Sequence, residues 1–143
     1  MDARPFDEVR QDLSRATTLY GQLQVHFERF CTEAKRLQEA SSPLRGVKTS
    51  WEGRSLLVDF LDRRQRVSFE FDRKAEKGFL RLENVSRSDA QRDVTTVLRI
   101  AFDRSGETDV GGGLEGGKVQ LALPADCKAL AVCLIEAGLD HAS

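Results

Sequence analysis

The sequence contains no long hydrophobic run. Acidic side chains interrupt its first 30 residues at Asp2, Asp7, Glu8, Asp12 and Glu28. This pattern excludes the apolar core of a secretory signal peptide. No segment approaches the ~18 consecutive apolar residues that a membrane-spanning helix needs. We therefore expect a soluble chain with no membrane partner.

The sequence also lacks an excess of charge of either sign. Twenty-two basic residues stand against 23 acidic ones, and the formal net charge is −1. Residues 62–92 hold a basic cluster, but acidic residues are interleaved with it. A nucleic-acid-binding domain usually carries strong positive charge and aromatic side chains for stacking. The pattern therefore predicts a solvated turn surface and no nucleic acid partner.

Cysteine and histidine are scarce. The three cysteines, Cys31, Cys127 and Cys133, are odd in number, and none shows the Cys-x-x-Cys spacing of a metal site. Cys127 and Cys133 lie about 240° apart around a predicted helix, so they cannot pair. His26 has no second histidine or cysteine at a neighbouring helical position. We expect three small apolar cysteines in a reducing cytoplasm, and no metal site.

One glycine-rich segment partly matches nucleotide-binding patterns. Residues 111–118 read GGGLEGGK, which overlaps both the phosphate loop and G-x-G-x-x-G. A phosphate loop needs Ser or Thr after its lysine, but Val119 follows Lys118. Both patterns also need a buried strand before the glycines and a helix after them, whereas a polar stretch precedes this segment and a strand-like run follows. We expect a hairpin connection and no nucleotide cofactor.

No catalytic residue is predicted. The Gly-x-Ser-x-Gly pattern of hydrolases is missing from the sequence. Acidic residues at outward strand positions could supply a catalytic pair of carboxylates: they are Asp59, Glu70, Glu83 and Asp103. Basic residues share the same predicted face, namely Lys48, Arg66, Arg81 and Arg99. Cross-strand ion pairing on a solvated face therefore explains them better than catalysis.

The clearest pattern lies in the first forty residues. Apolar residues recur at alternating steps of three and four, as in a heptad repeat: Phe6, Val9, Leu13, Ala16, Tyr20, Leu23, Phe27, Phe30, Ala34 and Leu37. The pattern predicts one long helix over residues 1–40, with Asp2 available as its cap. Ser41-Ser42-Pro43 ends it, and Gly21 is a weak point where it can bend.

The length of this helix is informative. Thirty-six helical residues would span about 54 Å, whereas a compact domain of this size is only about 37 Å across. The helix must therefore overhang its domain, bend near Gly21 or be covered by another chain. Aromatic residues and alanine replace the usual Ile, Val and Leu of a parallel coiled coil, which favours packing on a sheet. Packing on its own sheet and packing on another chain both stay open.

From residue 46 the apolar period changes to two, which predicts an antiparallel meander of five to seven strands over residues 46–123. The expected links are Glu52-Gly53, Asp62–Gln65 and Asp72–Gly78, and Ser86–Asp93 is a loop or one helical turn. The fifth strand should present one apolar face, made of Val94, Thr96, Leu98, Ile100 and Phe102.

Pro124 opens a final helix over residues 124–138, which is apolar nearly all round and is therefore expected to be buried on more than one side. The predicted fold class is α+β: a long N-terminal helix, an antiparallel sheet and a short C-terminal helix. We expect residues 1–143 to form a single domain.

Two functions are compatible with this architecture. The first is a non-enzymatic interaction or scaffold module that forms a homodimer or docks another protein through its long helix. Its predicted contact residues are Phe6, Val9, Leu13, Ala16 and Tyr20, because a small domain cannot cover so long an apolar stripe.

The alternative is a small-ligand-binding protein or enzyme with a pocket between helix and sheet. A deep cavity lined by Trp51, Phe60, Phe69 and His26 would favour this alternative. A filled core with an exposed helix stripe would favour the interaction module.

Overall fold

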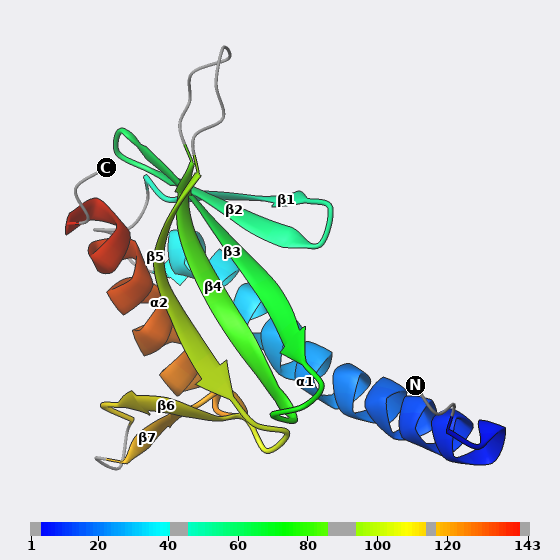
Figure 1. The fold of residues 1–143 in the computed structure, drawn as a ribbon. Helices are drawn as coiled ribbons and strands as arrows, with labels where there is room; N and C mark the ends of the chain where they lie inside the picture. The colour runs from blue at the N-terminus through cyan, green and yellow to red at the C-terminus, as the bar shows by residue number, and fades with distance from the viewer. Residues whose placement is uncertain (1–3, 41–45, 86–93, 114–116, 141–143) are drawn as a thin grey trace.

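A computed structural model describes residues 4–40, 46–85, 94–113 and 117–140, and the α+β class is confirmed (Figure 1). Helix α1 spans Phe6–Ala40, and helix α2 spans Pro124–Asp140. The strands are β1 (Lys48–Glu52), β2 (Ser55–Phe60), β3 (Arg63–Asp72), β4 (Lys77–Val85), β5 (Val94–Phe102), β6 (Glu107–Gly111) and β7 (Lys118–Gln120). The predicted Asp2 cap, the Ser41-Ser42-Pro43 stop and the Ser86–Asp93 segment lie outside the described residues.

The strands follow one another across the sheet in chain order, each antiparallel to the next, as a meander requires. The predicted Glu52-Gly53 turn is confirmed: Gly53 has a φ of 60° between paired Glu52 and Ser55. The predicted Asp62–Gln65 turn is wrong, because β3 already begins at Arg63. Gln65 is instead a buried strand residue whose Nε2 donates a hydrogen bond to the Ile135 carbonyl at 3.0 Å.

A bulge in β5 changes which residues share its apolar face. Leu82 pairs with Leu98, but the next residue, Glu83, pairs with Thr96, so β5 contains one extra residue at this step. Thr96 thereby reaches the outer face, where its hydroxyl accepts a hydrogen bond from Arg81 Nη2 at 3.0 Å. Val94, paired with Val85, lies on the same outer face, so the prediction that Val94 and Thr96 share the face of Leu98 is wrong.

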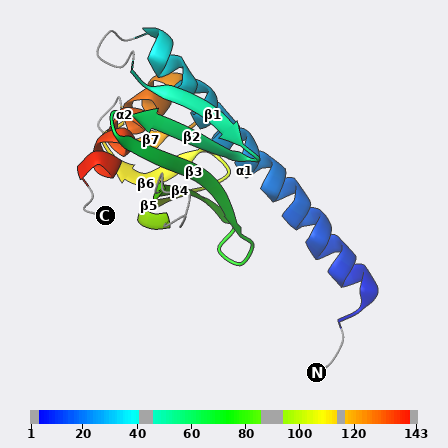
Figure 2. The same ribbon diagram turned by 90° about the horizontal axis from the view of Figure 1, so that it is seen from above.

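Both helices pack against the same face of the sheet (Figures 1 and 2). The core residues of the helices are Leu23, Phe27, Phe30, Cys31 and Ala34 from α1, and Cys127, Leu130, Ala131, Leu134 and Ile135 from α2. Strand residues such as Leu56, Val67, Leu80, Leu82 and Phe102 complete this core. No helix covers the opposite face of β3, β4 and β5 in Figure 1; we call it the outer face.

Helix α2 differs from its prediction in two respects. Val132 and Cys133 are exposed, so only the side of α2 that meets α1 and the sheet is buried. The helix also continues past Gly138 to Asp140. Gly138 is buried, and its carbonyl accepts a hydrogen bond from Asn84 Nδ2 at 3.0 Å. Sequence patterns miss such amide anchors because they join residues far apart in the chain.

Helix α1 is continuous through Gly21 and overhangs the rest of the fold (Figure 2). Its first fully buried residue is Leu23, which is 0% exposed. Residues 6–22 therefore precede the buried part of the helix over about 25 Å. Of the arrangements that its length allows, a bend at Gly21 is not observed and the helix overhangs its domain.

The packing around Gly78 supplies a test of this core. A Cβ atom there would lie 2.6 Å from Phe102 Cζ and 2.8 Å from Phe69 Cε2. We expect Gly78→Ala to lower the free energy of unfolding by about 1–3 kcal/mol through overpacking. Gly111→Ala is the matched control, because nothing lies within 4 Å of its added Cβ. Urea unfolding followed by Trp51 fluorescence measures both, and equal stability of the two variants would contradict this packing.

Candidate interaction surface

We call residues 6–18 of α1 the projecting segment, and its apolar residues Phe6, Val9, Leu13 and Ala16 the apolar stripe. Phe6 is 76% exposed and Leu13 is 51% exposed, while Val9 and Ala16 are half-buried. Full burial of a Phe or Leu side chain contributes about 1.5–3 kcal/mol. The stripe forgoes most of this contribution while it faces water.

Tyr20 marks the place where the chain's own sheet begins to cover this helix face. Its ring makes edge contacts with Phe69 at 5.4 Å and with Phe71 at 5.5 Å between centroids. Its hydroxyl accepts a hydrogen bond from Arg54 Nη1 at 3.3 Å. Of the five predicted contact residues, Tyr20 alone is thus packed against the strands, and the other four precede them.

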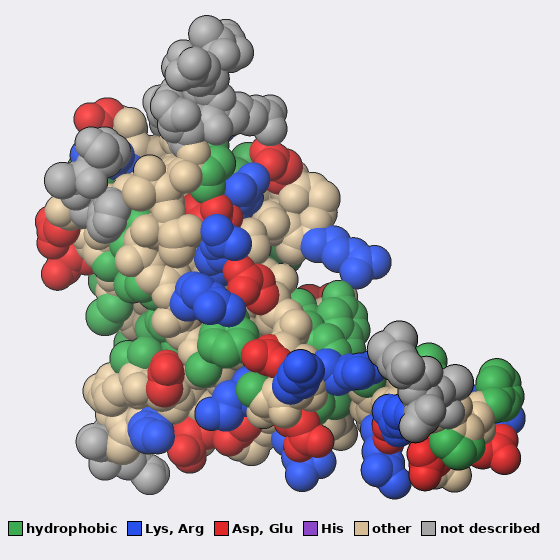
Figure 3. All heavy atoms as spheres, viewed as in Figure 1, with side chains coloured by type: hydrophobic (Ala, Val, Ile, Leu, Met, Phe, Trp, Pro, Cys, Tyr) green, Lys and Arg blue, Asp and Glu red, His purple; other side chains and the backbone are tan. Residues whose placement is uncertain are grey.

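Charged side chains flank the stripe in equal numbers. Residues 4–18 contain three basic and three acidic residues. Arg4 forms an ion pair with Asp12 and lies 3.9 Å from Glu8. The hydrogen bond from Arg4 lowers the pKa of Asp12. Figure 3 shows the projecting segment standing out from the body with apolar, basic and acidic side chains all on its surface.

A cleft of about 490 Å³ lies where the projecting segment meets the body. We call it the arginine cleft, because Arg15 of α1, Arg73 of the β3–β4 turn and Arg104 of the β5–β6 turn line it. Asp12 and Glu76 supply its acidic groups, so cationic groups outnumber anionic ones by three to two. Sequence analysis did not predict it, since turns far apart in the chain build it.

A second hollow, of about 500 Å³, lies between α1 and the β1–β2 hairpin. We call it the aromatic groove, because Tyr20, Phe27, Trp51 and Phe69 line it. Trp51 is 45% exposed, and the Lys35 ammonium lies 5.7 Å from its ring centroid. Tyr20 joins this groove to the end of the apolar stripe.

The predicted pocket residues do not come together in one cavity. Trp51 and Phe69 line the aromatic groove, whereas Phe60 is packed against the core and His26 is buried elsewhere. Deeper in the core, near Phe30 and Val67, the gap between the helices and the sheet is only about 10 Å³. This space holds at most about one water molecule. The core around Phe30 and Val67 is therefore filled, and the hollow between α1 and the sheet lies at its edge, in the aromatic groove.

His26 ties α1 to the β5–β6 turn. Its Nε2 lies 2.8 Å from the Arg104 carbonyl oxygen, and its ring meets Phe102 edge-on. Space around it is tight, because a Cβ on Gly106 would lie 3.0 Å from the imidazole. His26 is thus a tightly packed residue that connects α1 to the β5–β6 turn.

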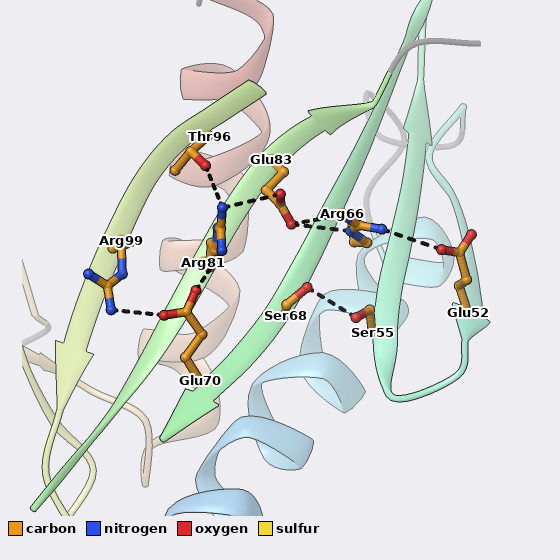
Figure 4. Close-up of polar contacts among 9 residues, drawn as sticks. All are labelled: Glu52, Ser55, Arg66, Ser68, Glu70, Arg81, Glu83, Thr96 and Arg99. Atoms are coloured by element: carbon orange, nitrogen blue, oxygen red, sulfur yellow. Dashed lines mark hydrogen bonds and ion pairs between the residues drawn. The ribbon is translucent and has the colours of Figure 1, made fainter. Parts of the chain in front are cut away.

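The outer face carries the predicted cross-strand ion pairs (Figures 3 and 4). Glu83 pairs with Arg66 at 3.1 Å and lies 3.7 Å from Arg81. Glu70 pairs with Arg81 at 3.0 Å and with Arg99 at 2.8 Å. Each of these carboxylates therefore has two arginine partners, an arrangement that suits ion pairing between strands better than acid catalysis.

The other two acidic candidates lie outside this network. Asp59 pairs with Arg64 at 2.8 Å. Asp103 closes the β5–β6 turn, where it accepts hydrogen bonds from the backbone N–H of Ser105 and of Glu107. Burial raises the pKa of Asp103, but hydrogen bonds from the Ser105 hydroxyl and from these backbone groups outweigh it, and the pKa lies below the ordinary value. Cross-strand ion pairing is therefore supported for Asp59, Glu70 and Glu83, whereas Asp103 accepts hydrogen bonds within a turn.

The glycine-rich segment connects β6 and β7, as predicted, although residues 114–116 lie outside the described part. The N–H groups of Gly112 and Gly113 both donate to the Gly117 carbonyl, at 3.1 and 2.9 Å. Lys118 begins a strand instead of a helix. The buried Asp126 carboxylate stands 3.2 Å from the position of a Gly113 Cβ. The Gly112 and Gly113 amides are therefore not free to bind a phosphate group. The nearby Asp126 carboxylate also disfavours a phosphate at this place.

The cysteines are free, with Cys31 and Cys127 buried and Cys133 exposed. Burial raises the pKa of Cys127 to about 11 and raises that of Cys31 still further. Within the described ranges, no group of three or more His, Cys, Asp or Glu residues is arranged to hold a metal ion. No helix in the same ranges is both long and apolar enough to cross a membrane.

Comparison with known proteins yields no assignment: no family model, curated protein or solved structure matches this chain.

Thiol accessibility tests the packing of the helices. At pH 8 we expect an aromatic disulfide reagent to modify only Cys133 rapidly in the folded protein, because burial of the other two thiols suppresses thiolate formation. Denaturant should expose all three. Cys133→Ser should abolish the rapid phase, and rapid modification of this variant would contradict the burial of Cys31 and Cys127.

Nucleotide binding tests the interpretation of the glycine-rich segment. We expect millimolar ATP, GTP or NAD to give no saturable calorimetric signal, because the Gly112 and Gly113 amides already donate to Gly117. A saturable signal that Lys118→Ala abolishes would restore the phosphate-site hypothesis.

Proposed function

We propose that this protein is a non-enzymatic interaction or scaffold module that self-associates or docks a partner protein through its projecting segment. The main observation in support is the apolar stripe, which lies on the part of α1 that extends past the core of the domain. A helix that faced only water would gain nothing from apolar residues at heptad spacing. The stripe therefore fits a second protein surface.

The groups that could do chemistry are engaged elsewhere in the fold, which favours this function over an enzymatic one. Glu70 and Glu83 are paired with arginines. The filled core around Phe30 and Val67 also favours an interaction module over a protein with a deep pocket. The aromatic groove enlarges the surface available to a partner at the Tyr20 end of the stripe.

We also propose a reducing compartment, such as the cytoplasm, as the place where the module works. The support is chemical: all three cysteines are free, and two of them pack as small apolar residues in the core.

Charge placed on the stripe tests the proposal. We expect the unmodified chain to be a homodimer at micromolar concentration, and Phe6→Asp with Leu13→Asp to convert it to a folded monomer. Both side chains are more than half exposed, so the fold should survive the substitutions. Light scattering measures mass, and circular dichroism measures folding.

The matched control adds the same two charges to the opposite side of α1. Gln11→Asp with Val25→Asp changes exposed residues away from the stripe and should leave the dimer intact. A monomeric unmodified chain well above micromolar concentration would refute self-association. Unfolding of the stripe variant would instead assign these residues to the chain's own core.

A further inference from the structure

The apolar stripe and the chain's own sheet occupy the same face of α1. Along this face the stripe continues into Tyr20, which packs on Phe69 and Phe71, and then into the buried Leu23 and Phe27. The sheet therefore begins where the stripe ends (Figure 2). Any partner of the stripe must lie on the side of α1 that the body already occupies further along.

This shared face restricts how two copies can meet. If two projecting segments paired in parallel through their stripes, both sheets would lie at the same end and on the same side, in each other's space. An antiparallel pair places the two bodies at opposite ends of the paired segments. Only the antiparallel arrangement therefore buries both stripes without a collision.

We infer that the occupant of the stripe is a second copy of this chain, antiparallel, with its first helical turn at the mouth of the arginine cleft. The inference rests on the proposed function and names its partner. The inferred dimer is isologous, which means that each copy contributes the same stripe and the same cleft.

The extent of the overlap follows from Tyr20. Because the sheet covers α1 from Tyr20 onward, the paired part is limited to about residues 6–16, with its centre near Gln11. Phe6 then lies opposite Ala16 of the second copy, and Val9 lies opposite Leu13. The large Phe6 ring then meets the small Ala16 methyl group, and Val9 meets Leu13, which is of similar size. The packing is therefore even along the pair.

The charges of the segment are compatible with self-pairing. Three basic and three acidic residues in positions 4–18 leave no net charge to repel a second copy. Glu8 lies two helical turns before Arg15, on the side of α1 that lines the arginine cleft. In the antiparallel pair, Glu8 of one copy comes beside Arg15 and Arg73 of the other.

The small contact area between the two stripes explains why the arginine cleft belongs to the inferred interface. Eleven paired residues give a footprint of about 16 Å by 10 Å, well below the ~800 Å² per partner of a standard interface. Contact between the first turn and the cleft enlarges the interface at both ends. The resulting dimer should still be a weak one.

Disulfide trapping tests the orientation. In a Cys133→Ser background, we expect a 1:1 mixture of Phe6→Cys and Ala16→Cys chains to form the mixed disulfide on mild oxidation. Each variant alone should not cross-link, because identical positions lie about 15 Å apart in the pair, beyond the ~7 Å between Cα atoms that a disulfide allows. Mass spectrometry identifies the products, and the exposed Gln11→Cys is the control that should stay uncrosslinked.

A charge exchange tests the cleft. We expect Glu8→Arg and Arg73→Glu each to raise the Kd of the dimer several-fold, and the double variant to restore it. A double variant as weak as the singles would refute the placement of the first turn at the cleft.

The outcomes separate the two proposals. Dimers that form Phe6→Cys homodisulfides are parallel, which overturns the orientation and leaves the proposed function standing. A chain that is monomeric in light scattering overturns this inference and self-association, and leaves docking of a different protein as the function. Dimers with the mixed disulfide and a charge exchange that rescues affinity support both.

Discussion

One continuous apolar face of α1 is the constraint on which the rest of the structure depends. From Leu23 to Ala34 this face supplies the centre of the core, between the sheet and α2. From Phe6 to Ala16 the same face has no strand to cover it. The sheet covers α1 only as far as the contacts of Phe69 and Phe71 with Tyr20. The contacts of the β3–β4 hairpin with Tyr20 thus set the boundary between the part of this face that packs in the fold and the part that we propose binds a partner.

Polar tethers hold this boundary in place. Gln65 and Asn84 reach from the sheet to backbone carbonyls of α2, at Ile135 and Gly138. His26 joins α1 to the β5–β6 turn through the Arg104 carbonyl. A buried amide or imidazole bonded to a backbone carbonyl is stabilising only at one position, because displacement leaves it unsatisfied. These hydrogen bonds therefore limit sliding of the helices along the sheet. Apolar packing alone limits such sliding less strictly.

Periodicity in the sequence predicts the elements well and their local irregularities poorly. Steps of three and four predict α1, and alternation predicts the strands, since both patterns repeat over many residues. The bulge at Thr96, the short turn before Arg63 and the burial of Gln65 each depend on one contact with a distant segment. The apolar stripe was predictable because it is a surplus of helix length. The arginine cleft was not, because Arg15, Arg73 and Arg104 meet only in the folded chain.

The two faces of the sheet explain why we propose the projecting segment, and not the sheet, as the binding surface. The inner face is covered by both helices, and around Phe30 and Val67 it leaves almost no free space. On the outer face, Glu70 and Glu83 are already paired with arginines of the same sheet, so a partner there would have to replace satisfied ion pairs. At the stripe a partner displaces only water from Phe6 and Leu13. Association costs least where apolar area is buried without breaking polar contacts, and the stripe meets this condition.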